Sequence, residues 1–544
     1  DVRNRTNASM SMLDFQQTDA AKAQLKDIAN LQLSVMNTME SKGIPSSFTF
    51  SYTSVVSGFA AQVPYGKIHE IKSIDGVEDV VLCQTYYTDS MGSATLGQAL
   101  TAAEVAAYSN NTQYQGMLIG ILDTGLDVNH EAFANAPAVQ KLQKSSLSKL
   151  LYQISQGEDG KTNITAYSYA ALWYAQKHSS SSLVLLTEDD LYKSGKVPFA
   201  FDYADADADV IPSADAVEKY GNDHGTHVAG TISAVNNNGI GVNGIAGGSG
   251  RNDGVKIMSC EILGKSESGS SGAGLSGQIR AFKYAADNGA VICQNSWGYT
   301  AGTISETDWK NGTYSALTRA IQYFNKYAGL DENGNQTGPM AGGIVVFAAG
   351  NDASNENCYP AADANVVSVG ALSYLGTPSY YTNYGKWVSM SAPGGDLMLS
   401  NAYGGVYSTS VAADGGSAYE GIQGTSMACP HVSGACALAI SYYYGAEKRK
   451  GLTGEMLRQA LLSSTQPVDR FCTGNYAGYE GMMGIGRLDT YKLLLTIAKM
   501  DGIPAQKVAA GATVSLDLRD YFLSANILGY TVSDPGVIGV SLQG

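Results

Sequence analysis

Short apolar runs alternate with amphipathic stretches along most of the chain from about residue 116 onward. Continuous apolar runs predict strands that are buried on both faces, and stretches with helical periodicity predict the helices that cover them. The alternation therefore predicts an α/β fold with a doubly wound, mainly parallel sheet. The expected strands are residues 117–122, 255–258, 290–293, 343–348, 366–369 and 387–390, and the expected helices are residues 224–235, 275–288, 314–327, 426–444 and 454–462.

The two ends of the chain follow other patterns, which predict three units: residues 1–88, 89–500 and 501–544. The first unit reads as a separate α+β domain. The last is rich in alternating β-forming residues and predicts the start of an immunoglobulin-like β-sandwich. In the first unit we expect helices at 18–41 and 68–74 and strands at 47–53, 56–63 and 77–82, followed by a polar stretch at 84–92.

Composition narrows the classes of function. A chain of 544 residues that is 44% hydrophobic and 15% charged can bury a large core. The formal net charge of −15 argues against a nucleic-acid partner, and it needs no other explanation than solubility. No apolar run is long enough for a membrane span. The seven cysteines include no Cys-x-x-Cys pair, which favours buried thiols over a disulfide framework.

Three short motifs carry candidate chemistry. Residues 123–125 read Asp-Thr-Gly, residues 224–231 read His-Gly-Thr-His-Val-Ala-Gly-Thr, and residues 424–428 read Gly-Thr-Ser-Met-Ala. A serine hydroxyl needs a base within hydrogen-bond reach and a third group that fixes the tautomer of that base. The order Asp, His, Ser along the chain is one of three orders in which such triads occur.

These motifs resemble the three signatures of the subtilisin-like serine proteases (subtilases), and the resemblance covers residues 116–500. Within this family, the chain most resembles the bacterial cell-envelope proteinases, the lactocepin-like branch. The resemblance implies a serine endopeptidase that forms an acyl-enzyme, with Ser426 as nucleophile, His224 as general base and acid, and Asp123 as the group that orients His224. The family's oxyanion donor corresponds to Asn351, in Ala-Ala-Gly-Asn at 348–351.

The resemblance also implies a substrate-binding edge and a specificity pocket. It leaves open whether Trp297 is a wall of that pocket or a plain core aromatic residue. The residues that it assigns to substrate binding are Ser296, Trp297, Gly298, Gly269, Ser270 and Cys358.

The chain departs from the family pattern in two spacings. The Asp123-to-His224 separation is 224 − 123 = 101 residues and includes an insert at about 134–220. The separation from Asn351 to Ser426 is 426 − 351 = 75 residues, too short for the protease-associated domain of the lactocepin-like branch. The natural substrate is therefore not carried over from that branch.

The implied chemistry requires no cofactor, although the sequence allows a structural calcium ion. Residues 235–242 resemble the family's calcium loop, with Val235, Asn237 and Val242 as candidate ligands, but Ala132 stands where the family has an aspartate. Zinc is disfavoured at His224 and His227, because their i, i+3 spacing lacks the His-Glu-x-x-His pattern.

Residues 1–88 resemble the inhibitory propeptide of the family, chiefly through residues 56–61 and 76–80. The resemblance implies a zymogen that cleaves itself near 86–92, with its own propeptide as an intramolecular inhibitor. It also implies a secreted or cell-surface bacterial protein that acts on protein or peptide substrates.

Two other classes of function stay open at this level. One is a surface-binding protein with an inactive protease fold, which the occupied catalytic positions disfavour. The other is an esterase, which the chain order and the lack of a Gly-x-Ser-x-Gly motif disfavour. Covalent labelling by a serine-directed fluorophosphonate separates the first class from a protease, and the relative turnover of esters and peptides separates the second.

Overall fold

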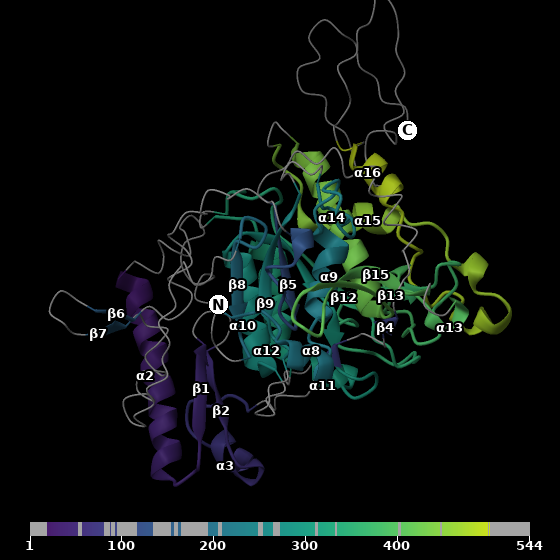
Figure 1. The fold of residues 1–544 in the computed structure, drawn as a ribbon. Helices are drawn as coiled ribbons and strands as arrows, with labels where there is room; N and C mark the ends of the chain where they lie inside the picture. Colours follow the sequence, from purple (N-terminus) through teal and green to yellow (C-terminus); the bar gives the residue numbers. More distant parts are fainter. Residues whose placement is uncertain are drawn as a thin grey trace, which may run out of the picture.

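A seven-stranded sheet runs through the centre of the computed structural model (Figure 1). The strand order is β14-β13-β12-β10-β5-β9-β8, and every neighbouring pair is parallel. The predicted α/β class with a doubly wound, mainly parallel sheet is confirmed. The strands are β5 (Leu118–Asp123), β8 (Phe199–Asp202), β9 (Lys256–Glu261), β10 (Ala290–Asn295), β12 (Ile344–Ala348), β13 (Val367–Leu372) and β14 (Met390–Pro393).

The structure describes most of the sheet-bearing region and part of what precedes it. The described residues are 19–52, 57–80, 87–88, 93–94, 117–133, 154–156, 162–164, 194–204, 209–248, 254–264, 272–310, 314–331, 334–400, 404–445, 449–498 and 500.

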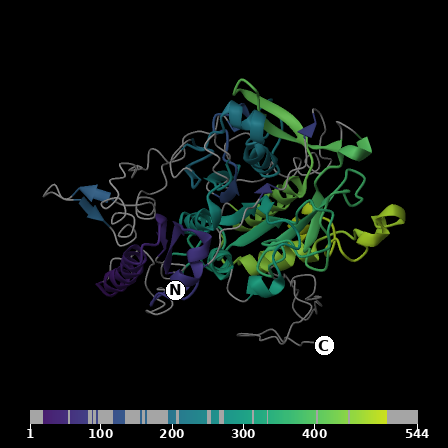
Figure 2. The same cartoon turned by 90° about the horizontal axis from the view of Figure 1, so that it is seen from below.

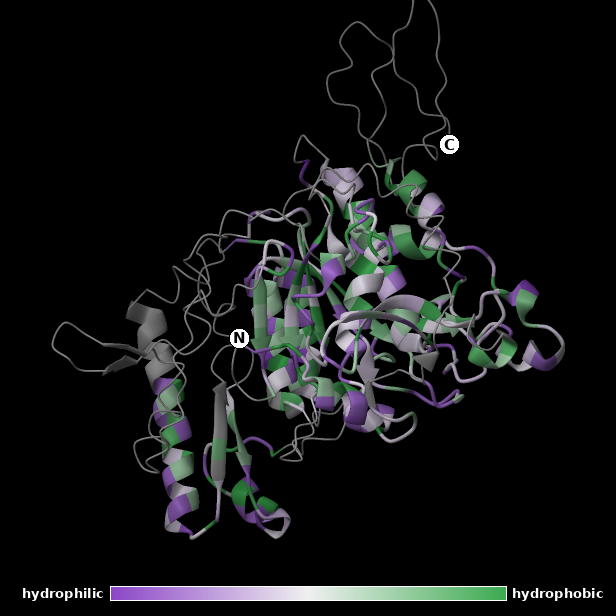
Figure 3. Ribbon diagram, in the orientation of Figure 1, coloured by the Kyte–Doolittle hydropathy of each residue, from purple (hydrophilic) through white to green (hydrophobic). Residues whose placement is uncertain are grey.

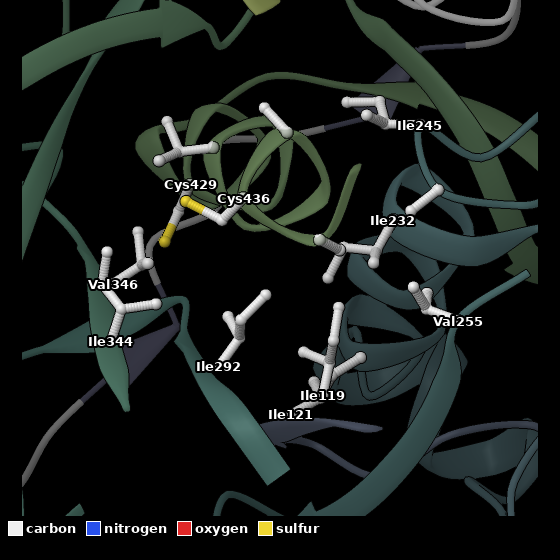
Figure 4. Close-up of a cluster of buried hydrophobic side chains, with 14 of the residues drawn as sticks. Ile119, Ile121, Ile232, Ile245, Val255, Ile292, Ile344, Val346, Cys429 and Cys436 are labelled. Atoms are coloured by element: carbon white, nitrogen blue, oxygen red, sulfur yellow. The ribbon is translucent and has the colours of Figure 1, made fainter. Parts of the chain in front are cut away.

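Helices cover both faces of the sheet. On one face, α9 (His224–Ser233) and α14 (Thr425–Tyr444) pack against the strands. On the other face lie α10 (Gly274–Asp287) and α12 (Ser315–Tyr327). Figure 4 shows the apolar side chains between the sheet and α14, with Cys429 and Cys436 of α14 turned toward Val346. The sheet is thus a buried layer between two helical layers.

The sequence of the central strand explains this two-sided burial. Ile119 and Ile121 of β5 belong to the core on the side of α9 and α14. Leu118 and Leu122 belong to the core on the side of α10 and α12. Because successive side chains of a strand point to opposite faces, a run of apolar residues in β5 supplies both cores.

A hairpin that the apolar pattern did not predict packs on α9. It consists of β15 (Val406–Val411) and β16 (Ser417–Ile422), and β4 (Ser93–Ala94) pairs with its outer edge. In the view of Figure 2 the hairpin projects from the sheet body as a pair of green strands. Its second strand leads within four residues to Ser426.

The N-terminal elements form a small unit with its own core. They are α2 (Asp19–Ser41), β1 (Ser47–Tyr52), β2 (Gly58–Gln62), η2 (Tyr65–Lys67) and α3 (Ile68–Lys72). Figure 1 shows this purple unit beside the sheet body, and Figure 3 shows mixed polar and apolar residues along α2. The apolar side of α2 packs on β1 and α3 through Val35, Met36, Met39, Ile44, Phe48, Ile71 and Ile74.

Short elements complete the described chain. They are β3 (Tyr87–Thr88), η3 (Glu131–Phe133), β6 (Ile154–Gln156), β7 (Thr162–Ile164), α8 (Ala214–Tyr220), β11 (Trp297–Gly298), α11 (Glu306–Lys310), α13 (Leu397–Ser400), α15 (Gly454–Ser463), η6 (Asp469–Phe471), η7 (Gly474–Tyr479) and α16 (Thr490–Ala498).

Several expectations need correction or fall on residues that the structure does not describe. Residues 77–80 form no strand, so the strand expected at 77–82 is wrong over its described part. The strand expected at 387–390 begins only at Met390. The insert expected at 134–220 contains β8, an edge strand of the sheet. The β-sandwich expected at 501–544 lies outside the described residues.

The cysteines and the possibility of a membrane span can be examined in the described residues. The six described cysteines are buried free thiols. Among the described helices, none has both the length and the apolar character to cross a membrane.

Candidate active site

Asp123 and His224 form a buried pair at the carboxyl edge of the sheet. Asp123 is the last residue of β5 and His224 is the first residue of α9, and both side chains are at most 2% exposed. His224 Nδ1 lies 2.6 Å from Asp123 Oδ1, so the imidazole donates to the carboxylate. The same oxygen accepts the backbone N–H of Thr124 (2.8 Å). His224 Nε2 is left without a hydrogen-bond partner among the described residues.

Close backbone contact holds this pair together. A Cβ at Gly225 would overlap the carbonyl oxygen of Gly125 and lie 3.3 Å from Asp123 Oδ1. The Thr124 hydroxyl accepts the Gly225 N–H (3.0 Å) and donates to the carbonyl of Asn222 (2.8 Å). The glycine after His224 is therefore needed for α9 to begin directly over the end of β5.

Ser426 lies in the first turn of α14, which packs against α9. Its hydroxyl donates to the carbonyl oxygen of Ser296 (3.2 Å), and the Ser296 hydroxyl donates to the carbonyl oxygen of Ser426 (2.8 Å). These reciprocal bonds tie the start of α14 to the residue between β10 and β11. In the first turn of α14, the Met427 and Ala428 N–H groups donate to the carbonyl of Gly424 (3.0 and 3.3 Å). The start of a helix favours a negative charge nearby.

The two amide atoms of Asn351 differ in their hydrogen bonding. Its Oδ1 accepts the backbone N–H (2.9 Å) and the hydroxyl (3.0 Å) of Thr425. The Thr425 hydroxyl in turn accepts the Gly350 N–H (3.0 Å). Asn351 Nδ2 has no hydrogen-bond partner among the described residues, so its donors are free at the start of α14.

The β15–β16 hairpin fixes the first turns of α9. Ser408 donates to the carbonyl of His227 (2.8 Å), Thr409 to that of Thr226 (2.6 Å), and Ser410 to the carboxylate of Asp223 (2.7 Å). Three consecutive hydroxyls therefore hold the turn that carries His224. The three hydroxyl residues of β15 were not identified from the sequence, because a serine or threonine in a strand has no signature of its own. Thr425 lies within the motif at 424–428, but the motif did not predict its contact with Asn351.

Two further histidines are buried beside the site. Burial lowers the pKa of His227 to about 4, although its Nε2 lies 3.2 Å from the carbonyl of Glu420. Burial likewise lowers the pKa of His431 to about 4, and its Nδ1 donates to the carbonyl of Met427 (2.7 Å). Both rings are therefore neutral at pH 7 and act as packing groups.

The candidate substrate edge is occupied by the chain itself. In β11, the backbone of Trp297 pairs with Thr88 and that of Gly298 pairs with Tyr87, in antiparallel register. The Trp297 indole is fully buried, donates to Asn295 Oδ1 (3.2 Å) and packs edge-on against Phe347. The Trp297 side chain thus packs as a core aromatic residue does, and its part in a pocket wall stays a prediction.

Of the other candidate pocket residues, the structure describes Cys358 but not Gly269 and Ser270. Cys358 is buried, its thiol donates to the carbonyl of Tyr299 (3.1 Å), and its Sγ would lie 2.9 Å from a Cβ at Gly350. Cys358 thus lies against the residue that precedes Asn351.

The candidate calcium loop offers few ligands of the right kind. Val235 is buried and donates its N–H to the carbonyl of Ala132 (2.9 Å), and Asn237 donates its N–H to Asn243 Oδ1 (3.3 Å). Within the part of the chain that the structure describes, no group of three or more His, Cys, Asp or Glu side chains could hold a metal. Val235, Asn237 and Val242 supply only neutral oxygens, so these three residues do not fit an ordinary calcium site.

Sequence comparison agrees with this geometry. The model of the subtilase family matches residues 114–486, which is more than half of the chain and includes Asp123, His224, Asn351 and Ser426. The chain belongs to the subtilase family.

Several bacterial proteases are similar to parts of this chain. The thermophilic serine proteinase of Bacillus sp. (strain AK1) is 31% identical over 306 residues, which are 56% of this chain and 58% of that protein. Thermitase of Thermoactinomyces vulgaris is 30% identical over 300 residues, which are 55% of this chain and 81% of that protein. An extracellular protease of Xanthomonas campestris pv. campestris is 32% identical over 219 residues, only 32% of its own length.

Among solved structures, the prenylagaramide maturation protease PagA aligns with 73% of this chain and 98% of its own, at 19% identity and a TM-score of 0.43. The chain spans less than two thirds of the length of the Bacillus proteinase and of the Xanthomonas protease.

Proposed function

We propose that this subtilase is a serine endopeptidase that hydrolyses peptide bonds through an acyl-enzyme. The observation that carries the proposal is the buried Asp123–His224 pair at 2.6 Å, with the second ring nitrogen of His224 unpartnered among the described residues and Ser426 at the start of the adjacent helix. A buried base that is fixed on one side and open on the other is what a serine nucleophile requires.

In the proposed mechanism, Ser426 Oγ turns from the carbonyl of Ser296 toward His224 Nε2. It transfers its proton to His224 as it attacks the substrate carbonyl carbon. Asp123 stabilises the charged imidazole, and Asn351 Nδ2 and the Ser426 N–H donate to the oxyanion. His224 then protonates the leaving amine, and a water molecule, activated by the same imidazole, releases the acyl group and restores Ser426.

We further propose that residues 1–88 act as an inhibitory propeptide that the enzyme cuts off near residues 86–92. Support comes from β3, whose backbone pairs with the Trp297–Gly298 edge that a substrate would use. A strand added to an exposed edge is a recurring mode of peptide binding. A peptide substrate would have to displace β3, so the uncut chain is the inactive form.

Protein and peptide substrates and a secreted or cell-surface location complete the proposal. The names of two relatives, the extracellular protease of Xanthomonas campestris pv. campestris and the extracellular basic protease of Dichelobacter nodosus, support secretion. The lactocepin-like branch stays a prediction, because similarity to these relatives does not distinguish one branch of the subtilases from another.

Labelling with a fluorophosphonate tests the chemistry. We expect the wild-type protein to be labelled and to turn over peptides, and Ser426→Ala to do neither. Ser441→Ala is the matched control, because Ser441 is another buried serine of α14. Labelling of the Ser426→Ala variant would contradict the assignment of the nucleophile. Turnover of p-nitrophenyl esters without turnover of peptides would favour an esterase.

A further inference from the structure

A proline inside α14 deprives the candidate nucleophile of one backbone hydrogen bond. Pro430 lies within the helix, four residues after Ser426. In an α-helix each N–H donates to the carbonyl of the residue four positions earlier, and proline has no N–H. The carbonyl of Ser426 therefore lacks its usual helical donor. The Ser296 hydroxyl donates to this carbonyl instead (2.8 Å).

Gln294 fixes the direction in which the Ser296 hydroxyl points. Both side chains are fully buried, and Gln294 Nε2 donates to Ser296 Oγ (2.8 Å). A hydroxyl has a single hydrogen, and that of Ser296 goes to the Ser426 carbonyl, which can only accept. Ser296 Oγ must therefore accept its second bond. The NH₂ side of the Gln294 amide is the group that supplies it.

The other end of the Gln294 amide binds farther along α14. Its Oε1 accepts the Ser433 hydroxyl and the Cys429 thiol (3.3 Å for the thiol). Ser433 is fully buried and follows Ser426 by seven residues, which is about two helical turns, so both lie on one face of α14. A single side chain of β10 thus connects the first turn of the helix with a later one.

We infer that Gln294 is a positioning residue for Ser426, acting through the Ser296 hydroxyl and the main-chain carbonyl of Ser426. The inference rests on the proposed serine endopeptidase function. Gln294 acts on the backbone of α14 and not on the substrate. A nucleophile reacts well only from a narrow range of positions, so a loosened first turn of α14 slows the attack.

A purely structural role for Gln294 makes a different prediction. Buried amides are hydrogen-bonded in most proteins, and the loss of such bonds lowers stability wherever they lie. If Gln294 instead acts through the Ser426 carbonyl, a donor from another source should replace it. Pro430→Ala provides that donor, because it restores an N–H four residues after Ser426.

A double-mutant cycle therefore tests the inference. Gln294→Met keeps the approximate size of the side chain and removes its hydrogen bonds. We expect kcat on a peptide substrate to fall about 10-fold, which corresponds to one buried hydrogen bond, with KM changed by less than about twofold. In the Pro430→Ala background the same substitution should lower kcat by less than about threefold. Expressing kcat per fluorophosphonate-labelled site removes the effect of incomplete self-processing.

Gln278→Met is the matched control. Gln278 of α10 is also fully buried, and both of its amide atoms lack a hydrogen-bond partner among the described residues. We expect this variant to keep the wild-type kcat. A wild-type kcat in Gln294→Met, or an equal loss with and without Pro430→Ala, would overturn the inference and leave the proposed function intact. A wild-type protein that turns over no peptide would refute the proposed function itself.

Discussion

At the scale of single residues, Asn351 combines an anchored acceptor with a free donor. Its Oδ1 is held by Thr425, while its Nδ2 has no partner among the described residues. We expect Asn351→Asp to keep the acceptor and lose the donor. The rate constant kcat should then fall by at least about 10²-fold with little change in melting temperature. Steady-state kinetics on a peptide substrate and thermal unfolding measure the two effects.

The Asn351→Ala variant is the comparison for this prediction. It loses both amide atoms, so it should show a similar loss of kcat and an additional loss of about 1 kcal/mol in the free energy of unfolding. Wild-type kcat in Asn351→Asp would instead mean that Asn351 only anchors Thr425.

The buried His431 predicts a dependence of stability on pH. Its pKa of about 4 in the folded protein lies below the ordinary value of 6.5. Between these values the unfolded chain takes up a proton that the folded protein does not, so the free energy of unfolding falls as the pH drops from 6.5 to 4. At 1.36 kcal/mol per pH unit, His431 accounts for about 3 kcal/mol of this loss.

Urea unfolding at several pH values gives the slope of the free energy of unfolding against pH. We expect His431→Gln to reduce this slope between pH 6.5 and 4 by the amount that corresponds to one proton taken up on unfolding. His227 has the same depressed pKa and would keep part of the slope. The exposed His69 is the control, and His69→Gln should leave the curve unchanged. Parallel curves for wild type and His431→Gln would refute the prediction.

The four central residues of the site could be predicted from the sequence, but the residues that hold them in position could not. Asp123, His224, Asn351 and Ser426 stand in distinctive motifs, and the structure brings Asp123 into contact with His224 and Asn351 into contact with the residue before Ser426. Thr425 and the hydroxyls of β15 act through contacts between residues far apart in sequence, and no local pattern encodes such contacts. The Trp297 side chain was ambiguous for the same reason, since burial depends on Phe347.

At the scale of elements, the packing of α9 on the hairpin has no spare space. A Cβ at Gly230 would overlap the Thr409 hydroxyl, which donates to the carbonyl of Thr226. We expect Gly230→Ala to cost about 1–3 kcal/mol in the free energy of unfolding. It should also lower kcat, because the displaced helix carries His224. Chemical denaturation and peptide kinetics measure both.

Gly478→Ala is the matched control for this substitution. Gly478 lies in η7, and a Cβ there meets no atom within 4 Å. We expect it to leave stability and kcat near the wild-type values. If Gly230→Ala behaves like Gly478→Ala, the hairpin does not position α9.

The ligands available in the loop at 235–242 determine how much the removal of calcium should change the stability of the protein. Neutral oxygens alone bind calcium weakly, with dissociation constants of about 10⁻³ M or higher. We therefore expect about 10 mM calcium, compared with EDTA, to raise the free energy of unfolding by less than about 1.5 kcal/mol and to leave kcat unchanged. A calcium titration followed by thermal unfolding checks this. Stabilisation of about 4 kcal/mol would require carboxylate ligands from the rest of the chain.

Most regular elements of the sheet-bearing region were predictable, and the misses have physical causes. Continuous apolar runs gave β5, β10 and β12 within a residue or two, because burial on both faces leaves a clear pattern. β8 was missed because its four residues lie at the sheet edge within an insert. The β15–β16 hairpin was missed because β15 buries a run of hydroxyl residues, which do not register as apolar.

At the scale of the whole molecule, the apolar cores are separate. Two large cores lie on either side of the sheet, while the N-terminal unit has a small core of seven buried residues. A small core leaves a unit marginally stable. The described residues that follow this unit reach the sheet body through the two-residue ladder of β3 on β11. The two parts should therefore unfold separately.

The last prediction uses this separation in Ser426→Ala, which keeps the chain uncut under the proposed function. Met39 is 1% exposed in the N-terminal core, and the adjacent Glu40 is exposed. Removing a buried methionine side chain costs about 2–5 kcal/mol, and a buried carboxylate adds to that cost, so Met39→Asp should unfold residues 19–80. We expect hydrogen exchange, read by mass spectrometry, to lose protection in α2 and β1 while β5 and β10 stay protected. Glu40→Ala should change neither region. Loss of protection in β5 together with α2 would mean that the N-terminal unit and the sheet body fold as one cooperative domain.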